Sequence, residues 1–126
     1  MADLGGILCE EKDHESARAA YREALEIFAA LGHRRGIARA LEGFGCMAVA
    51  QGEASRTLKL CGAASHLRRM IGAPLPRAEQ SKLDQMLVPA WSSLTASRGQ
   101  SEWEAGYSMT LEKAIQYSLE DSAPAI

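Results

Sequence analysis

The chain repeats a faint pattern of residue types at an offset of 40 residues, and this pattern limits the folds open to it. A bulky residue and a glycine are followed at fixed intervals by an apolar residue, a small residue, a bulky residue, an alanine and a glycine. The first set is Leu4-Gly5, Leu8, Ala17, Tyr21, Ala24 and Gly32, and the second is Phe44-Gly45, Ala48, Thr57, Cys61, Ala64 and Gly72. The positions that agree suit paired helices, because glycine lets a neighbouring helix approach closely and alanine leaves room for a bulky side chain.

This spacing is typical of the tetratricopeptide helical hairpin. The composition favours helix as well, since the chain has 22 alanines, no asparagine and only two valines, Val49 and Val88. An ordinary alanine-rich bundle would also alternate small and large residues, and it stays the alternative. We therefore predict an all-α fold of about two tetratricopeptide-like antiparallel hairpins with a C-terminal helical cap. A chain of 126 residues is expected to form a single domain over 1–126.

Apolar residues at spacings of three and four predict about seven helices. They cover 2–11, 13–31, 35–51 and 53–71, then one helix from Pro76 kinked at Pro89, a short helix around Trp103, and a last helix capped by Thr110. Two separate helices around Pro89 are the alternative, and a turn is expected at 97–100. The inward stripe of the 13–31 helix is predicted to be Ala17, Ala20, Tyr21, Ala24, Ile27, Phe28 and Leu31. The hairpins would occupy 1–72, the capping helices 73–120 and a frayed tail 121–126.

Targeting and redox signals are weak. No run approaches the roughly 18 apolar residues of a membrane span, and residues 1–11 lack the plan of a signal peptide. Cys9, Cys46 and Cys61 lie at apolar helical positions. We expect reduced thiols in a core, with a disulfide as the alternative. These signals predict a cytoplasmic protein without membrane contact.

Several stretches resemble one family. They are Arg34–Gly43, Gln51-Gly52, Leu60–Ala64, Ile71–Pro76 and Leu111–Leu119. They are similar to the C-terminal tetratricopeptide-repeat-like region of bacterial ATPase-linked transcriptional regulators, of the LuxR-type or antibiotic-regulator-like kind. The resemblance implies a protein-binding or effector-sensing module of a bacterial signalling or transcription protein. It implies no ATPase or DNA-binding activity here, because the phosphate loop and the helix-turn-helix reader are missing. Thr57, in place of an alanine, and Pro89 depart from the family pattern.

Catalytic and metal-binding patterns are not found in the sequence. His14, His33 and His66 have no partner at helical spacing, and no nucleophile motif is present. We therefore expect no enzyme activity, no metal and no cofactor.

Two surfaces are predicted to bind something. The concave face of the hairpins would carry Arg35, Arg39, Glu42, Cys46 and Val49 and would bind a protein partner. An ordinary solvated face with an Arg39–Glu42 pair is the alternative. Topology would also gather Arg34, Arg68, Arg69 and Arg77 into a possible anion site. Alternatively, Arg68 and Arg69 complement the dipole at a helix end. A net charge of −2 excludes a globally basic nucleic-acid binder, but it leaves accessory nucleic-acid or anion binding through this arginine cluster as an alternative function.

The first hairpin is expected to lack its start, because the register of 35–51 would place its beginning before Met1. This predicts an association edge at Leu4, Ile7 and Leu8, which a protein partner or a second copy would cover. A small-molecule receptor, with its pocket between the last hairpin and the Trp91/Trp103 cap, is a further alternative.

Overall fold

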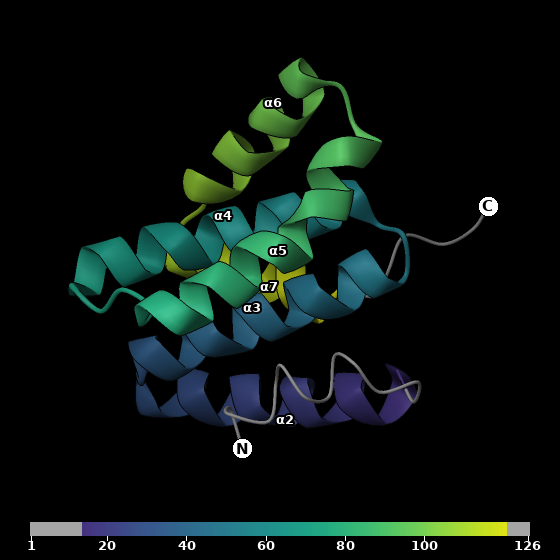
Figure 1. The fold of residues 1–126 in the computed structure, drawn as a ribbon. Helices are drawn as coiled ribbons and strands as arrows, with labels where there is room; N and C mark the ends of the chain where they lie inside the picture. Colours follow the sequence, from purple (N-terminus) through teal and green to yellow (C-terminus); the bar gives the residue numbers. More distant parts are fainter. Residues whose placement is uncertain (1–13, 121–126) are drawn as a thin grey trace.

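The computed structural model describes residues 14–120, which form six α-helices and no strand (Figure 1). The helices are α2 (His14–Leu31), α3 (Arg34–Ala50), α4 (Ala54–Ile71), α5 (Arg77–Ser93), α6 (Ala96–Tyr107) and α7 (Leu111–Leu119). The predicted all-α class is confirmed. The expected helix over 2–11 and the expected tail over 121–126 lie outside the described residues. None of the described helices is long and apolar enough to cross a bilayer.

Local signals fix the helix ends. Gly32, Gly52 and Gly72 have φ of 67°, 79° and 65° and follow α2, α3 and α4. This left-handed conformation suits glycine and ends a helix by turning the chain away. At the start of α7, the Thr110 hydroxyl accepts a hydrogen bond from the Lys113 amide at 3.1 Å. The predicted caps at these positions are therefore confirmed.

The expected turn at 97–100 is wrong, because α6 runs through it. The Thr95 hydroxyl accepts a hydrogen bond from the Arg98 amide at 3.1 Å and so begins the helix earlier. Helix α5 continues through Pro89 as one element, which was the preferred prediction. Pro76 lies directly before the first residue of α5 rather than inside it.

The helices pack mainly in chain order. Helix α3 lies between α2 and α4, α5 and α6 pack against α4, and α7 returns to touch α2, α3 and α4 (Figure 1). Short loops join α2 to α3 and α3 to α4, so each pair forms a hairpin. A Cβ at Gly45 would lie 2.6 Å from the Cys61 sulfur, so this glycine allows the close approach that the repeat predicted. The arrangement is compatible with tetratricopeptide hairpins.

Two apolar cores hold the helices together. The first joins α2, α3, α4 and α7, and its fully buried side chains include Leu25, Ile37 and Leu41. The second lies between α4 and α5, around Leu58 and Leu87. The predicted cap therefore covers the last hairpin on two sides, with α5 and α6 on one side and α7 on the other.

The inward stripe predicted for α2 needs correction. Leu25 is fully buried, although it was not assigned to the core, whereas Ala20 is exposed. Ile27 and Leu31 are 50% and 72% exposed. The reason is that α2 carries apolar residues on two faces. In the described structure, α3 covers only the face of Ala17, Tyr21 and Leu25.

Helices α4 and α6 cross at two glycines. A Cβ at Gly106 would collide with the Lys59 carbonyl, and a Cβ at Gly62 would collide with the Trp103 carbonyl. The two backbones can approach this closely because neither position has a side chain. Beside this crossing, the centroids of the Trp91 and Trp103 rings lie 5.8 Å apart, and Trp103 packs against the second core.

Candidate functional site

A hollow of about 180 Å³ lies between α3, α4 and α7. Its lining residues are Arg34, Leu41, Ala63, His66, Leu67, Met70, Met109, Thr110, Leu111 and Ala114. Most of these side chains are apolar. A cavity of about 150 Å³ with apolar walls is large enough to admit a benzene ring. This hollow is therefore the candidate binding site in the described part of the chain.

Short side chains create the space. Ala63 on α4 and Ala114 on α7 are both buried, and each has only a methyl group to fill the gap between its helix and the next. Leu41 on α3 forms a wall and is fully buried. Met70 is 66% exposed and Met109 is half-buried in the segment before α7. Methionine side chains are flexible, so these walls can adjust to an occupant.

The polar residues of the hollow are basic or neutral. Arg34 is exposed and is the first residue of α3. The His66 ring stacks on the Tyr107 ring, with the two centroids 4.6 Å apart. The Thr110 hydroxyl already caps α7. Helices α3 and α7 both begin here, and helix N-termini carry a partial positive charge.

The residues assigned to the concave face contact other parts of this chain. Arg39 Nη1 lies 3.4 Å from Glu79 Oε1 on α5. Glu42 binds Arg68 on α4, and Val49 packs against the second core. Cys46 is 9% exposed. Among the five predicted residues, only Arg35 is classed as exposed, so this face is largely occupied within the fold.

The predicted arginine cluster is divided. Arg68 is buried, and its Nε and Nη2 atoms donate to Glu42 while Nη1 donates to the Ala73 carbonyl. Arg69 Nη1 lies 3.3 Å from the Tyr107 hydroxyl. Arg34 and Arg77 are exposed. Arg68 is therefore engaged inside the fold, and anion binding by the other three arginines stays a prediction.

The cysteines differ from one another. Cys61 is a free, buried thiol, as expected, and burial raises its pKa, with the nearby Glu42 charge adding to the effect. Cys46 is disulfide-bonded, so the expectation of a reduced thiol is wrong for this residue. Cys9 and the predicted association edge at Leu4, Ile7 and Leu8 lie outside the described residues.

A cluster that was not predicted from the sequence surrounds the end of α7. Arg56 Nη2 lies 3.2, 3.2 and 2.8 Å from the carbonyl oxygens of Tyr117, Ser118 and Glu120. Arg22 donates to the Leu119 carbonyl at 3.0 Å, and Arg18 to the Glu120 carbonyl at 3.4 Å. These carbonyls lie at the end of a helix, where no further turn follows to supply the usual amide donors, although the Tyr117 carbonyl also accepts from the Glu120 amide at 3.2 Å. The arginines come from α2 and α4, far from α7 in sequence, so no local signal could reveal them.

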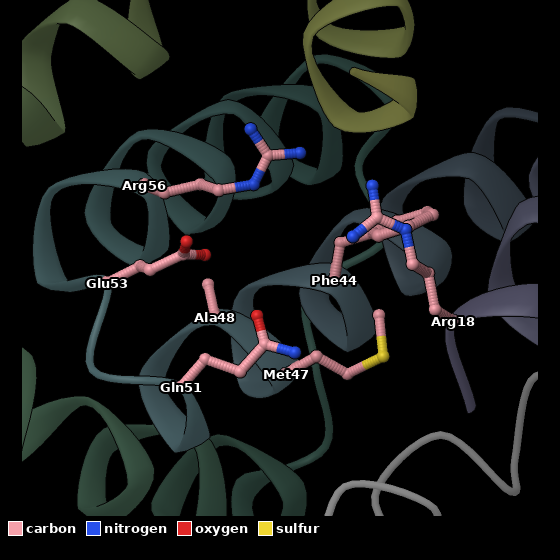
Figure 2. A pocket seen from close by; sticks show the side chains of 7 residues that line it. All are labelled: Arg18, Phe44, Met47, Ala48, Gln51, Glu53 and Arg56. Atoms are coloured by element: carbon pink, nitrogen blue, oxygen red, sulfur yellow. The ribbon is translucent and has the colours of Figure 1, made fainter. Parts of the chain in front are cut away.

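Figure 2 shows the depression beside this cluster, with the guanidinium groups of Arg18 and Arg56 near the ribbon of α7. The depression has a volume of only about 10 Å³, which is enough for about one water molecule. Its arginines already bind α7. We therefore regard it as a structural contact and keep the larger hollow as the candidate site.

No group of three or more possible metal ligands occurs among residues 14–120. In comparisons with known proteins, no family model matches this chain, and no match is found to a curated protein or to a solved structure.

Proposed function

We propose that this chain is a non-enzymatic protein-interaction module that associates through α2. The observation that supports this proposal most directly is an apolar seam on that helix, formed by Ala20, Ala24, Ile27 and Leu31. The spacing of these residues is four, three and four, which is the spacing that places side chains along one face of a helix. Ile27 and Leu31 are 50% and 72% exposed.

Among the helices of residues 14–120, the seam lies on α2, the outermost helix of the α2–α3–α4 stack. Helix α3 packs on the neighbouring apolar face of α2, and α7 touches α2 near its arginines (Figure 1). Neighbouring exposed apolar side chains on successive turns are a common mark of an association site. A second helix laid along the seam would bury Ile27 and Leu31 as α3 buries Leu25.

A second copy of this chain is the partner that the surface fits. A two-fold interface brings the same patch of both copies together, so the patch must complement itself. The apolar seam meets this requirement, because its side chains can pack against the same side chains of a second copy. The Arg22–Glu26 pair, at 3.9 Å, lies on the far side of α2 and is not part of the seam. The net charge of −2 opposes such association only weakly.

The biological setting of the proposal comes from the family resemblance. A module of this kind would join copies of a bacterial signalling or transcription protein, and an effector could act by changing that association. The proposal includes no catalytic step.

Sedimentation equilibrium of the full chain over a wide range of concentrations tests the proposal. We expect a reversible dimer, and we expect the Ile27→Glu/Leu31→Lys double variant to be a monomer with an unchanged helical circular dichroism spectrum. Val88 on α5 is also apolar and 56% exposed, but it lies away from the seam. Val88→Lys is therefore the matched control and should still form dimers. A wild-type chain that stays monomeric at every concentration contradicts the proposal.

A further inference from the structure

We propose that the hollow between α3, α4 and α7 binds a small organic carboxylate whose apolar body is about the size of a benzene ring. This site is separate from the α2 seam, so the inference is tested independently of the proposed function. Nothing in the family resemblance assigns it. The arguments come from its volume, its walls and the charge of the groups around it.

The volume and the walls of the hollow determine the size and polarity of the apolar part of the ligand. The hollow measures about 180 Å³, so it has room for a single ring. Leu41, Leu67 and Leu111 form apolar walls. A ring that replaces water against these side chains gains the usual benefit of burying apolar surface.

The surrounding charges set the head group. Arg34 and His66 line the hollow, and no acidic side chain among residues 14–120 does. An arginine can bind a carboxylate through two parallel hydrogen bonds, and a histidine ring can donate a third. Glu112 is the nearest acid along α7, but it is exposed and is not part of the lining.

The helix ends support the same charge preference. Helices α3 and α7 both direct their N-termini to this region, and these ends favour an anion. Helix α4 brings its C-terminus here, which has the opposite partial charge. Two of its last carbonyls, those of Arg68 and Arg69, already accept hydrogen bonds from the Ala73 and Gly72 amides. The balance favours a carboxylate over an ammonium group.

Titration followed by NMR chemical shifts tests this inference with three probes of equal ring size, namely benzoate, benzylamine and toluene. We expect benzoate to bind more tightly than benzylamine, with shifts that centre on Ala63, Leu111 and Ala114. Arg34→Gln should weaken benzoate binding about fivefold, which is the effect expected of a charged hydrogen bond from an exposed arginine. It should leave toluene binding unchanged.

Arg35→Gln is the matched control, because Arg35 is the next residue of α3, is exposed and does not line the hollow. Its benzoate affinity should equal that of the wild type. Ala114→Leu fills the hollow and should abolish binding of both benzoate and toluene, while thermal unfolding shows whether the variant folds. If that variant does not fold, the Arg34 and Arg35 pair still decides the question. The inference is overturned if benzoate causes no shifts at the hollow, if benzylamine binds as tightly as benzoate, or if both arginine variants lose affinity equally.

Discussion

Arg68 binds both oxygens of the Glu42 carboxylate, with Nε 2.6 Å from Oε2 and Nη2 3.0 Å from Oε1. The two side chains are only 8% and 12% exposed, and they join the middle of α3 to the last turn of α4. Glu42 came from the surface predicted to bind a protein and Arg68 from the surface predicted to bind an anion. Two residues assigned to separate sites therefore form one internal contact, which fixes the hairpin.

Removing one partner of this pair should destabilise the fold. Glu42→Gln leaves the Arg68 charge buried without its counter-ion, and we expect a loss of about 3 kcal/mol in the free energy of unfolding. The double variant Glu42→Gln/Arg68→Met should be more stable than the sum of the two single changes predicts, because it removes both charges. Urea denaturation followed by circular dichroism measures all three variants. Strictly additive losses would show that the pair contributes nothing as a pair.

Tyr21 provides a prediction about alkaline pH. Its hydroxyl is buried without a hydrogen-bond partner among the described residues. Burial raises the pKa of Tyr21 from 10.0 to about 12, although the Arg39 charge lowers it in part. The folded state therefore favours the neutral phenol. The free energy of unfolding is therefore unaffected by Tyr21 ionisation below pH 10, and it falls as the pH rises from 10 towards 12.

Tyr21→Phe keeps the ring and removes the unpaired hydroxyl. We expect this variant to be more stable than the wild type by about 1 kcal/mol at neutral pH. The difference should grow above pH 10, because the phenylalanine cannot ionise. Thermal melting at a series of pH values measures this difference. A constant difference between the two proteins from neutral to alkaline pH would contradict the role of Tyr21 ionisation.

Local chemistry made much of the fold predictable. Gly32 and Gly72 end helices because their left-handed φ suits glycine, and Thr110 begins one because its hydroxyl caps a neighbouring amide. The turn expected at 97–100 is wrong partly because Thr95 caps α6 and partly for a reason that is not local. Gly99 is helical and its missing side chain admits the Trp91 ring, whose nearest atom would lie 2.9 Å from a Cβ.

Contacts between distant segments could not be predicted in the same way. Periodicity showed that α2 carries apolar residues at helical spacing. It could not show that α3 would cover Leu25 and leave Ile27 exposed. The alternative of a small-molecule receptor placed its pocket near Trp91 and Trp103, whereas the hollow lies between α3, α4 and α7, because the segment before α7 returns to α4. Such features depend on how helices meet, which no short stretch of sequence specifies.

The crossing of α4 and α6 depends on Gly106. Alanine is a better helix former than glycine by about 1 kcal/mol, so Gly106→Ala would stabilise an isolated helix. In this fold the new Cβ would collide with the Lys59 carbonyl, which is backbone and cannot move aside easily. We therefore expect a net loss of about 2 kcal/mol in thermal or urea unfolding. Ser101→Ala, at an exposed position of the same helix, should be slightly stabilising. Equal effects at both positions would argue against a close crossing.

Arg56 should control how firmly α7 is held. Its guanidinium contacts three carbonyls at the end of α7 and lies 4.8 Å from the centre of the Tyr117 ring. Arg56→Met keeps the apolar stem and removes these contacts, and we expect a loss of about 2 kcal/mol in the free energy of unfolding.

Hydrogen exchange should accelerate at the α7 amides, while α3 is affected less, because α7 is the shortest of the described helices and meets the others through few residues. Arg77→Met, an exposed arginine at the start of α5, is the control and should leave α7 protected. Since α7 also forms one wall of the hollow, Arg56→Met should weaken benzoate binding as well, although Arg56 does not line that site. Unchanged exchange at α7 in this variant would show that its core side chains hold the helix without the arginine.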